Sequence, residues 1–565
     1  MREGLHGRRW PEALIPAGLF ALALLIRGWE LGLRPAAPEE AAQAWAAWRG
    51  GTLPPGGSPL LAGWNATAFG IFGPDEGWMR SGAALAGALT VLALWAVLRP
   101  IGPAAAIGAA WLWAVSPSAL MAARFLDGGV VVAAVLATAL ALWRASFPSR
   151  WIGLGIALGM GAAAGPAFWT GVLLLLPVFW LDPPEPAFPR WKALGVFGVT
   201  ALLAGAWGGW RGSGARETVE GLSAWLTGFA PEGLPVWWEA LRAFLYGEAL
   251  ILTLGLTGGI LSIRRRDRFG TALAIAAGIG TGLQLVRLGA PFTEHAVALI
   301  PWVVLAGVAV QWVWETVKPV GRLQPAAVLG GAGIGGIGLG TVAAFMNLQG
   351  GVEGARWLVL LGILGLLGFG IWILSGLFGT EEEEDSLDRA EAGREPGSAP
   401  GNPFGGAWVR SPVALGVAGV LALALGLGQL AGAAARVRRA DPVPGFSLPE
   451  MTAPAVREVV EMLRREAARR HGWPGGLSVV VVAEEKEAFW RWTFRGFRMA
   501  VYHRPPASGI GDVWLTPEDM PVPLEPDRWL GRPFPVIVDQ RGVEPMERRM
   551  TLWVREEGQK TQPGE

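Results

Sequence analysis

The sequence predicts a mainly α-helical protein that crosses a membrane many times and ends in a small α/β domain. Of the 565 residues, 52% are hydrophobic and only 16% are charged, whereas soluble proteins usually carry about 25% charged residues. Apolar stretches long enough to cross a bilayer recur up to residue 434, and the composition then turns soluble. We therefore expect a multi-span domain at 1–434 and an α/β domain at 435–565.

A helix that spans a bilayer needs about 20 mainly apolar residues, and this rule predicts about thirteen spans. The first apolar run is too long for the core of a cleaved signal peptide, so we expect it to remain as the first span. Gly165 and Pro166 predict a turn that divides one long apolar stretch into two helices. The expected spans are 11–31, 79–98, 102–121, 125–143, 151–165, 167–181, 192–210, 241–263, 270–287, 292–314, 324–346, 355–378 and 411–434.

Basic residues in short loops favour the cytoplasmic side of a plasma membrane, and they give an independent check on this count. The clearest cluster is "RRRDR" at 264–268. With a cytoplasmic N-terminus and thirteen spans, the basic loops all fall on the cytoplasmic side. The loop at 32–78 and the C-terminal domain are then extracytoplasmic. The charged, Pro/Gly-rich stretch at 380–405 is expected to be a disordered cytoplasmic linker.

The C-terminal domain is expected to combine one long helix with several short strands. "APAVREVVEMLRREAARRHG" has a helical apolar period, and "LSVVVVAEE" has the pattern of a buried strand. "EAFWRWTFRG" is consistent with a short helix or turn, and "RMAVYHR", "GDVWLT" and "PFPVIVD" with further strands. No Gly-rich loop follows the first strand, which argues against a nucleotide site.

Composition excludes several classes of function. The chain has no cysteine, which excludes disulfides, thiolate metal sites and a cysteine nucleophile. A net charge of +1 creates no global field that would attract nucleic acid.

An adjacent pair of acids, Glu39 and Glu40, follows Pro38 just outside the first span. Acids are stabilising in the first turn of a helix, and proline is favoured at its first position. A carboxylate at the membrane surface can also accept a proton from an attacking hydroxyl. The two interpretations are compatible. A lipid-phosphate leaving group would need cationic partners, and basic residues at outer helix ends are Arg80, Arg124, Arg211, Arg287 and His295.

Other polar and aromatic residues of the outer segments have local explanations. Arg124 and Asp127 are spaced to pair with each other, either as a self-neutralised pair or as part of a site. Asp75 and Glu76 are expected to cap the second span. On a predicted loop helix, Trp45 and Trp48 are expected to anchor it in the headgroup layer, with sugar stacking as the alternative.

The order of several motifs resembles that of a known enzyme superfamily. The motifs are "PEEAAQAWAAWRGG", "GGSPLLAGWNATAFGIFG", then "MRSGAALAGALT" leading to "SPSALMAARFLDGG", and later "EHAVALIPWVVLAGVAV". In this order they resemble the GT-C glycosyltransferases that use polyprenyl-phosphate sugars, in the branch of protein O-mannosyltransferases and the lipid A aminoarabinose transferase. The resemblance covers 30–180 well and 285–310 loosely.

This resemblance implies roles for individual residues. Glu39 takes the place of the catalytic Asp and would be the general base. Glu40 matches the acid beside it and would complete the catalytic pair by orienting the base or the acceptor. Arg124, Asp127 and His295 match family residues implied in binding substrate or lipid phosphate, with Asp127 positioning Arg124. Arg80, a basic residue at an outer helix end, is expected to bind the lipid phosphate with them. The resemblance implies neither a metal nor another cofactor. Two departures matter: the base is Glu, one methylene longer, and Glu294 stands where the family usually has a basic residue.

We therefore expect an inverting membrane glycosyltransferase. Its partners would be a polyprenyl-phosphate sugar donor, an extracytoplasmic protein, lipid or glycan acceptor, and membrane lipids, but no nucleic acid. One alternative is a transporter or flippase-associated protein for lipid-linked sugars, although the two halves show no convincing repeat. Another is a non-catalytic relative that scaffolds an envelope complex.

Overall fold

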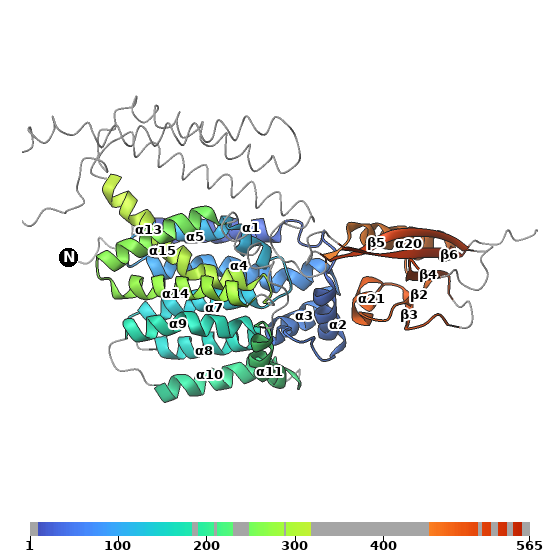
Figure 1. Ribbon diagram of the computed structural model, residues 1–565, viewed down its shortest axis with the longest axis horizontal. Helices are drawn as coiled ribbons and strands as arrows, with labels where there is room; N and C mark the ends of the chain where they lie inside the picture. Colours follow the sequence, from blue (N-terminus) through green and yellow to red (C-terminus); the bar gives the residue numbers. More distant parts are fainter. Residues whose placement is uncertain are drawn as a thin grey trace, which may run out of the picture. The chain divides into compact units, whose positions relative to one another are not determined.

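The computed structural model of the 565-residue chain describes the helical N-terminal part and much of the C-terminal region (Figure 1). The described residues are 9–147, 149–183, 190–207, 212–229, 248–287, 290–317, 451–506, 511–520, 529–539 and 546–555. By compactness the chain forms two units, Met1–Gly307 with Ala433–Glu565, and Val308–Gly432. The C-terminal strands thus belong to the same unit as most of the helices, and the domain boundary near 435 stays a prediction.

Ten apolar helices lie at ten of the thirteen expected spans. Glu76–Leu98, Arg268–Val286 and Glu294–Glu315 are long and apolar enough to cross a membrane, and the other seven are shorter. The three remaining expected spans, 324–346, 355–378 and 411–434, fall outside the described residues, as does the linker. The ten helices are α1 (Arg9–Gly28), α4 (Glu76–Leu98), α5 (Pro103–Val115), α7 (Gly129–Arg144), α8 (Arg150–Ala164), α9 (Ala167–Leu181), α10 (Arg190–Gly205), α13 (Ala249–Arg264), α14 (Arg268–Val286) and α15 (Glu294–Val317).

The turn predicted at Gly165 and Pro166 is confirmed. Gly165 has φ +120°, a conformation that residues with a side chain rarely adopt, and it separates α8 from α9. Pro166 lacks an N–H group and fixes its own φ, so the second helix starts cleanly after it. The long apolar stretch is therefore two helices of 15 residues each.

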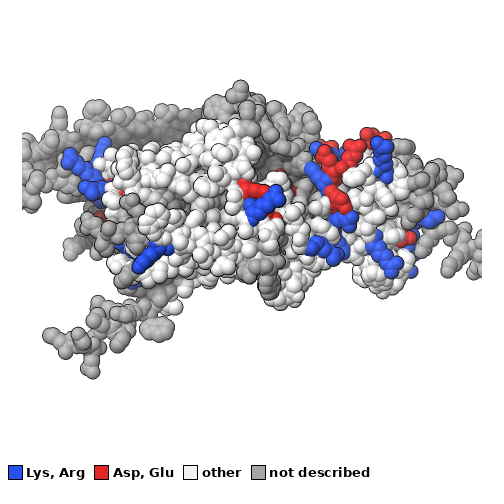
Figure 2. Space-filling view, turned by 90° about the horizontal axis from the view of Figure 1, so that it is seen from below, with Lys and Arg blue, Asp and Glu red and all other residues white. Residues whose placement is uncertain are grey.

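The loops between the helices gather at two ends. At one end Arg144 donates to the carbonyl oxygen of Val97 and interacts electrostatically with Asp182 and Asp267. The basic cluster 264–268 lies at this end, and Figure 2 shows blue side chains there beside a mostly uncharged helical surface. The loop 29–78 and the segments 116–128 and 287–294 lie at the other end, where the predicted site residues meet.

Three short helices cover this second end: α2 (Pro38–Arg49), α3 (Pro59–Phe72) and α11 (Gly214–Thr227). The predicted loop helix is α2, which begins at Pro38 and ends where Gly50 adopts φ +74°. Ser58 caps α3 by accepting from the Leu61 N–H group at 3.2 Å. A further short helix, α6 (Pro117–Ala122), follows α5 after a break at Ser116.

The C-terminal region contains α20 (Pro454–His471), α21 (Glu487–Thr493) and a six-stranded mixed sheet of order β1-β5-β6-β4-β2-β3. β2 is parallel to β3 and β4, whereas β6 is antiparallel to β4 and β5. The sequence pattern predicted α20, α21, β2, β3, β4 and β5 but missed β1 and β6, because the charged "MERRM" hides the second of these. The strands are β1 (Met451–Thr452), β2 (Ser478–Val482), β3 (Arg498–Tyr502), β4 (Val513–Pro517), β5 (Trp529–Asp539) and β6 (Met546–Arg555).

Candidate active site

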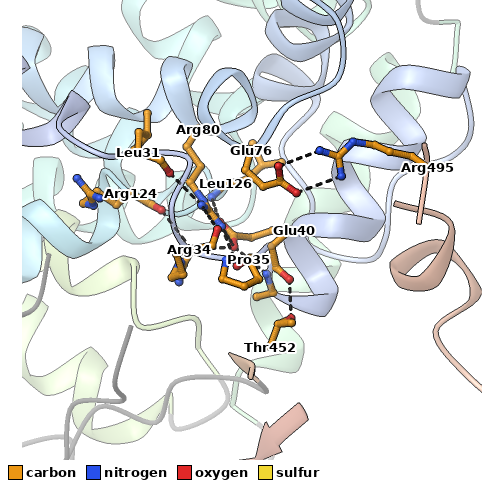
Figure 3. A network of polar contacts seen from close by, with 12 residues as sticks. Leu31, Arg34, Pro35, Glu40, Glu76, Arg80, Arg124, Leu126, Thr452 and Arg495 are labelled. Atoms are coloured by element: carbon orange, nitrogen blue, oxygen red, sulfur yellow. Dashed lines mark hydrogen bonds and ion pairs between the residues drawn. The ribbon is translucent and has the colours of Figure 1, made fainter. Parts of the chain in front are cut away.

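Glu40 is the centre of the polar network in Figure 3. Its side chain is almost fully buried on the first turn of α2. One carboxylate oxygen accepts from Arg80 at 3.0 Å and from the Leu126 N–H group at 2.9 Å. The other accepts from Arg34 at 2.7 Å, from Arg80 at 2.9 Å and from the Ala37 N–H group at 2.9 Å. Every acceptor position of this carboxylate is thus engaged.

The surroundings of Glu40 keep it ionised. Burial by itself would raise the pKa of this carboxyl group, but the guanidinium groups of Arg34 and Arg80 outweigh burial and lower the pKa to about 2. A carboxylate so well stabilised by fixed donors is a poor proton acceptor near neutral pH. Glu40 therefore suits an anchoring role better than that of a general base.

Glu39 lies one position earlier on α2, and its side chain is exposed rather than buried. Successive helical residues point about 100° apart, so one turn of helix directs the two acids into different surroundings. Pro38 before them starts the helix, and the N-terminal partial charge of α2 favours a carboxylate at both positions. The two acids of one sequence motif thus have separate environments.

Arg80 uses all of its hydrogen-bonding capacity within the protein. It is 1% exposed on α4, and its five N–H groups go to Glu40 and to the carbonyl oxygens of Leu31, Arg34 and Pro35. No N–H group is left for a phosphate, contrary to the role expected from its position at an outer helix end. Arg80 instead holds the segment before α2 in a fixed path.

The expected pairing of Arg124 with Asp127 is wrong. Arg124 donates to the carbonyl oxygens of Arg27, Trp29 and Glu30, at the C-terminal end of α1. Asp127 accepts from the Gly129 N–H group at 2.7 Å and from the Thr293 hydroxyl at 2.6 Å. Spacing alone suggested a helical pair, but this segment is an irregular turn after α6 and directs the two side chains apart. Asp127 therefore cannot position Arg124.

Positive charge is in excess around Glu40. The guanidinium group of Arg34 lies 3.6 Å from the centre of the Phe125 ring and also donates to the carbonyl oxygen of Arg124. Burial and the neighbouring Arg80 lower the pKa of Arg34 to about 9, and burial lowers the pKa of Arg124 to about 10. Both remain protonated at neutral pH. Two guanidinium groups, of Arg34 and Arg80, thus share one carboxylate, and Arg124 adds positive charge near Arg34. A bound anion would stabilise this arrangement.

The segment before α15 brings a second set of polar residues close to the first. Phe292 packs edge-on against Phe125 with ring centres 4.6 Å apart. His295 is nearly buried, and its Nδ1 lies 2.7 Å from the carbonyl oxygen of Phe292. Thr293 bonds Asp127, as described above. His295 is therefore near the site. Its described hydrogen bond, however, is to its own segment and not to the side chains of Arg34, Arg80 or Arg124.

Glu294 forms a buried ion pair with Arg287, and both side chains are less than 4% exposed. Glu294 also accepts from Thr170 at 3.0 Å, and Arg287 donates to the carbonyl oxygen of Trp225 on α11. The acid at the family's usual basic position thus binds Arg287 and fastens α11 to α9 and α15. Arg211, another candidate cation, falls outside the described residues.

Two buried charges beside the break between α5 and α6 were not predicted from the sequence. Arg27 is 0% exposed and donates to the carbonyl oxygens of Trp113 and Ala114, at the end of α5. Glu248, also 0% exposed, accepts from the Ser116 hydroxyl and the Ser118 N–H group, at the start of α6. Each charge matches the partial charge of the helix end that it faces. Their position within apolar stretches was the signal that could have found them.

The other expectations for the outer loop are mostly supported by the geometry. Asp75 caps α4 by accepting from the Gly77 N–H group at 2.7 Å. Glu76 follows it but pairs with Arg495 of the C-terminal region at 2.8 Å, which no local pattern foretold. Trp45 and Trp48 lie on α2 with ring centres 5.5 Å apart, both partly exposed.

No group of three or more His, Asp or Glu side chains that could hold a metal ion occurs in the part of the chain that the structure describes. The expectation of a site without a metal therefore stays a prediction.

Comparisons with known proteins add the class of fold. No protein-family model and no curated protein sequence matches the chain. Among solved structures, the chain shares its fold with ArnT. Crystal structures of ArnT from Cupriavidus metallidurans match over nearly their whole length. The form bound to undecaprenyl phosphate has 15% identity and a TM-score of 0.54, covering 95% of this chain and 97% of ArnT.

The apo form of the same ArnT gives 16% identity and a TM-score of 0.53, covering 96% of this chain and 98% of ArnT. An Archaeoglobus fulgidus oligosaccharyltransferase, tethered with an acceptor peptide, matches at 13% identity with a TM-score of 0.45, covering 87% of this chain and 64% of that one. The two ArnT structures thus have a fold similar to that of this chain.

Proposed function

We propose that this protein is an inverting membrane glycosyltransferase that moves a sugar from a polyprenyl-phosphate carrier to a hydroxyl or other nucleophile of an acceptor outside the cytoplasm. The observation that carries the proposal is the different environment of the two acids on the first turn of α2. A buried, fully bonded Glu40 holds the site, and an exposed Glu39 projects beside it. ArnT, which has the same fold, was crystallised with undecaprenyl phosphate.

In the proposed reaction, the Glu39 carboxylate accepts the proton of the acceptor group. The acceptor oxygen or nitrogen forms a bond to the anomeric carbon of the sugar while the bond from that carbon to the phosphate oxygen breaks. The electron pair of the broken bond stays on the lipid phosphate. Arg34 and Arg124 stabilise the charge of this leaving group. Attack opposite the leaving group inverts the anomeric centre.

The geometry changes the expected roles of Arg80 and Glu40 and adds a role for Arg34. Arg80 and Glu40 act as a positioning pair, because their bonds are all made within the protein. Arg34, which the sequence analysis did not single out, replaces Arg80 as a phosphate ligand. Its side chain is 15% exposed, against 1% for Arg80, so it is the more accessible cation.

The orientation we propose places the α2 end of the helices outside the cytoplasm, in a multi-pass protein of the plasma membrane with a cytoplasmic N-terminus. The basic turn at 264–268 lies at the opposite end, and basic residues favour the cytoplasmic side. The C-terminal α/β region then faces the acceptor compartment.

The test is sugar transfer, or hydrolysis of the donor, by the purified protein in lipid with a panel of polyprenyl-phosphate sugars. Glu39→Gln should abolish turnover while leaving the folded protein intact. Glu220→Gln, at an exposed acid of α11 that pairs only with Arg216 in the described structure, is the matched control and should turn over normally. Equal turnover by Glu39→Gln would move the base elsewhere. No turnover by the folded wild type with any donor would favour a scaffold or a flippase-associated protein.

A further inference from the structure

The C-terminal region contacts the helix that carries Arg80. Arg495, in the turn between α21 and β3, donates to both carboxylate oxygens of Glu76, at 3.1 and 2.8 Å (Figure 3). It also donates to the carbonyl oxygen of Pro74 at 3.1 Å. The two side chains of this ion pair are only 11% and 21% exposed. Glu76 is the first residue of α4, one turn before Arg80. This ion pair therefore fixes the N-terminal end of α4.

A second contact holds the segment that leads into α2. The Thr452 hydroxyl of β1 donates to the carbonyl oxygen of Ala36 at 2.6 Å, in a buried position. Arg457 of α20 donates to the carbonyl oxygen of Leu33. The next residue after Ala36 is Ala37, whose N–H group binds Glu40. The C-terminal region thus bonds the backbone of Ala36, directly beside the Ala37 N–H group that binds Glu40.

A third contact is largely apolar. Trp492 of α21 is fully buried and packs against Phe69 of α3 with ring centres 5.4 Å apart. Arg491, one residue earlier, lies over the ring of Trp45 on α2 at 6.0 Å. The C-terminal region therefore holds the loop 29–78 at three places: just before α2, on α2 itself, and at both sides of the turn between α3 and α4.

We propose that the C-terminal α/β region is a clamp that positions the acid-bearing helix α2 for the transfer reaction, through the Glu76–Arg495 ion pair and the Thr452–Ala36 hydrogen bond. This inference rests on the proposed function. Glu76, Arg495 and Thr452 are positioning residues, since their described contacts are with one another, with protein backbone and with the ring of Trp492. Loss of the Glu76–Arg495 ion pair should affect the base more than the phosphate ligands. Arg34 keeps its bonds to Glu40 and to the carbonyl oxygen of Arg124, and Arg124 is held by carbonyl oxygens of α1 and its end.

The kinetic test removes the Glu76–Arg495 ion pair and then restores it with the charges exchanged. A displacement of about 1 Å at a reacting group can lower a rate on the order of 100-fold. Arg495→Gln should therefore lower kcat by about 10- to 100-fold and leave the KM for the donor within a factor of about 3. Glu76→Arg and Arg495→Glu should each do the same, and the double variant should recover most of kcat. Arg464→Gln, which removes an exposed ion pair within α20, is the control and should behave as wild type.

A second measurement does not depend on activity. Hydrogen–deuterium exchange of peptides covering 31–49 should be faster in Arg495→Gln and in Thr452→Val than in wild type, and unchanged in Arg464→Gln. If no donor is turned over, the proposed function fails while this exchange pattern still supports the clamp. Wild-type exchange and wild-type kcat in both clamp variants would overturn the clamp. The clamp would also be overturned if Glu76→Arg and Arg495→Glu both fold but the double variant does not recover kcat.

Discussion

The two acids on α2 should respond differently to replacement: Glu40→Gln should lower stability, whereas Glu39→Gln should abolish activity. Glu40→Gln removes the charge that two arginines share and leaves Arg34 and Arg80 facing each other without a carboxylate. Removing one partner of a buried ion pair typically costs about 3–5 kcal/mol. Arg34 keeps 15% of its side chain exposed, so solvent screens part of the loss, and we expect a value near 3 kcal/mol.

Glu39→Gln is the matched comparison, because it is the same chemical change one residue away on an exposed side chain. Its stability should stay near that of wild type, since substitutions at exposed sites usually have small effects, whereas sugar transfer should be lost. Thermal unfolding in lipid, followed by the loss of monodisperse protein, measures the first quantity, and donor turnover measures the second. The reasoning is refuted if Glu40→Gln unfolds at the wild-type temperature, or if the two variants lose stability equally.

Three further outcomes follow from the described contacts. The pKa of Glu40 is lowered from 4.5 to about 2. Its ion pairs therefore stabilise the fold fully above pH ~4.5, and this contribution is lost as the pH falls toward 2. The stability advantage of wild type over Glu40→Gln should shrink over the same pH range. A methyl group at Gly128 would lie 1.7 Å from the carbonyl oxygen of Ala164, so Gly128→Ala should destabilise by about 1–3 kcal/mol in thermal unfolding, whereas Gly70→Ala, with open space around it, should not. Glu248→Gln keeps an acceptor for the first N–H groups of α6 and should fold, but Glu248→Leu leaves one of them unpaired and should unfold at a lower temperature.

Local features of the sequence were sufficient for the helices and for the start of α2. Hydropathy over a single segment decides whether it can lie in a bilayer, and ten expected spans within the described residues are apolar helices. Pro38 followed by two acids specifies a helix N-terminus by short-range chemistry alone. The cap at Asp75 and the turn at Gly165 belong to the same kind of feature.

Pairings along one helix or turn were less reliable. Arg124 and Asp127 had the spacing of a helical ion pair, but helix α6 ends at Ala122 and the turn after it sends each side chain to a different element. The buried charges Arg27 and Glu248 could have been found from their position within apolar stretches. Their partners could not, because most of these are main-chain groups beside the break between α5 and α6.

The sequence by itself determined that this chain forms membrane helices with an acid pair at the start of a loop helix, because both properties depend on residues close together along the chain. Only the tertiary structure decided which of the two acids is buried. Glu40 meets Arg80 across 40 positions and the Leu126 N–H group across 86. The Glu76–Arg495 ion pair joins residues 419 positions apart. Such contacts depend on how helices pack, and no short stretch of sequence encodes that packing.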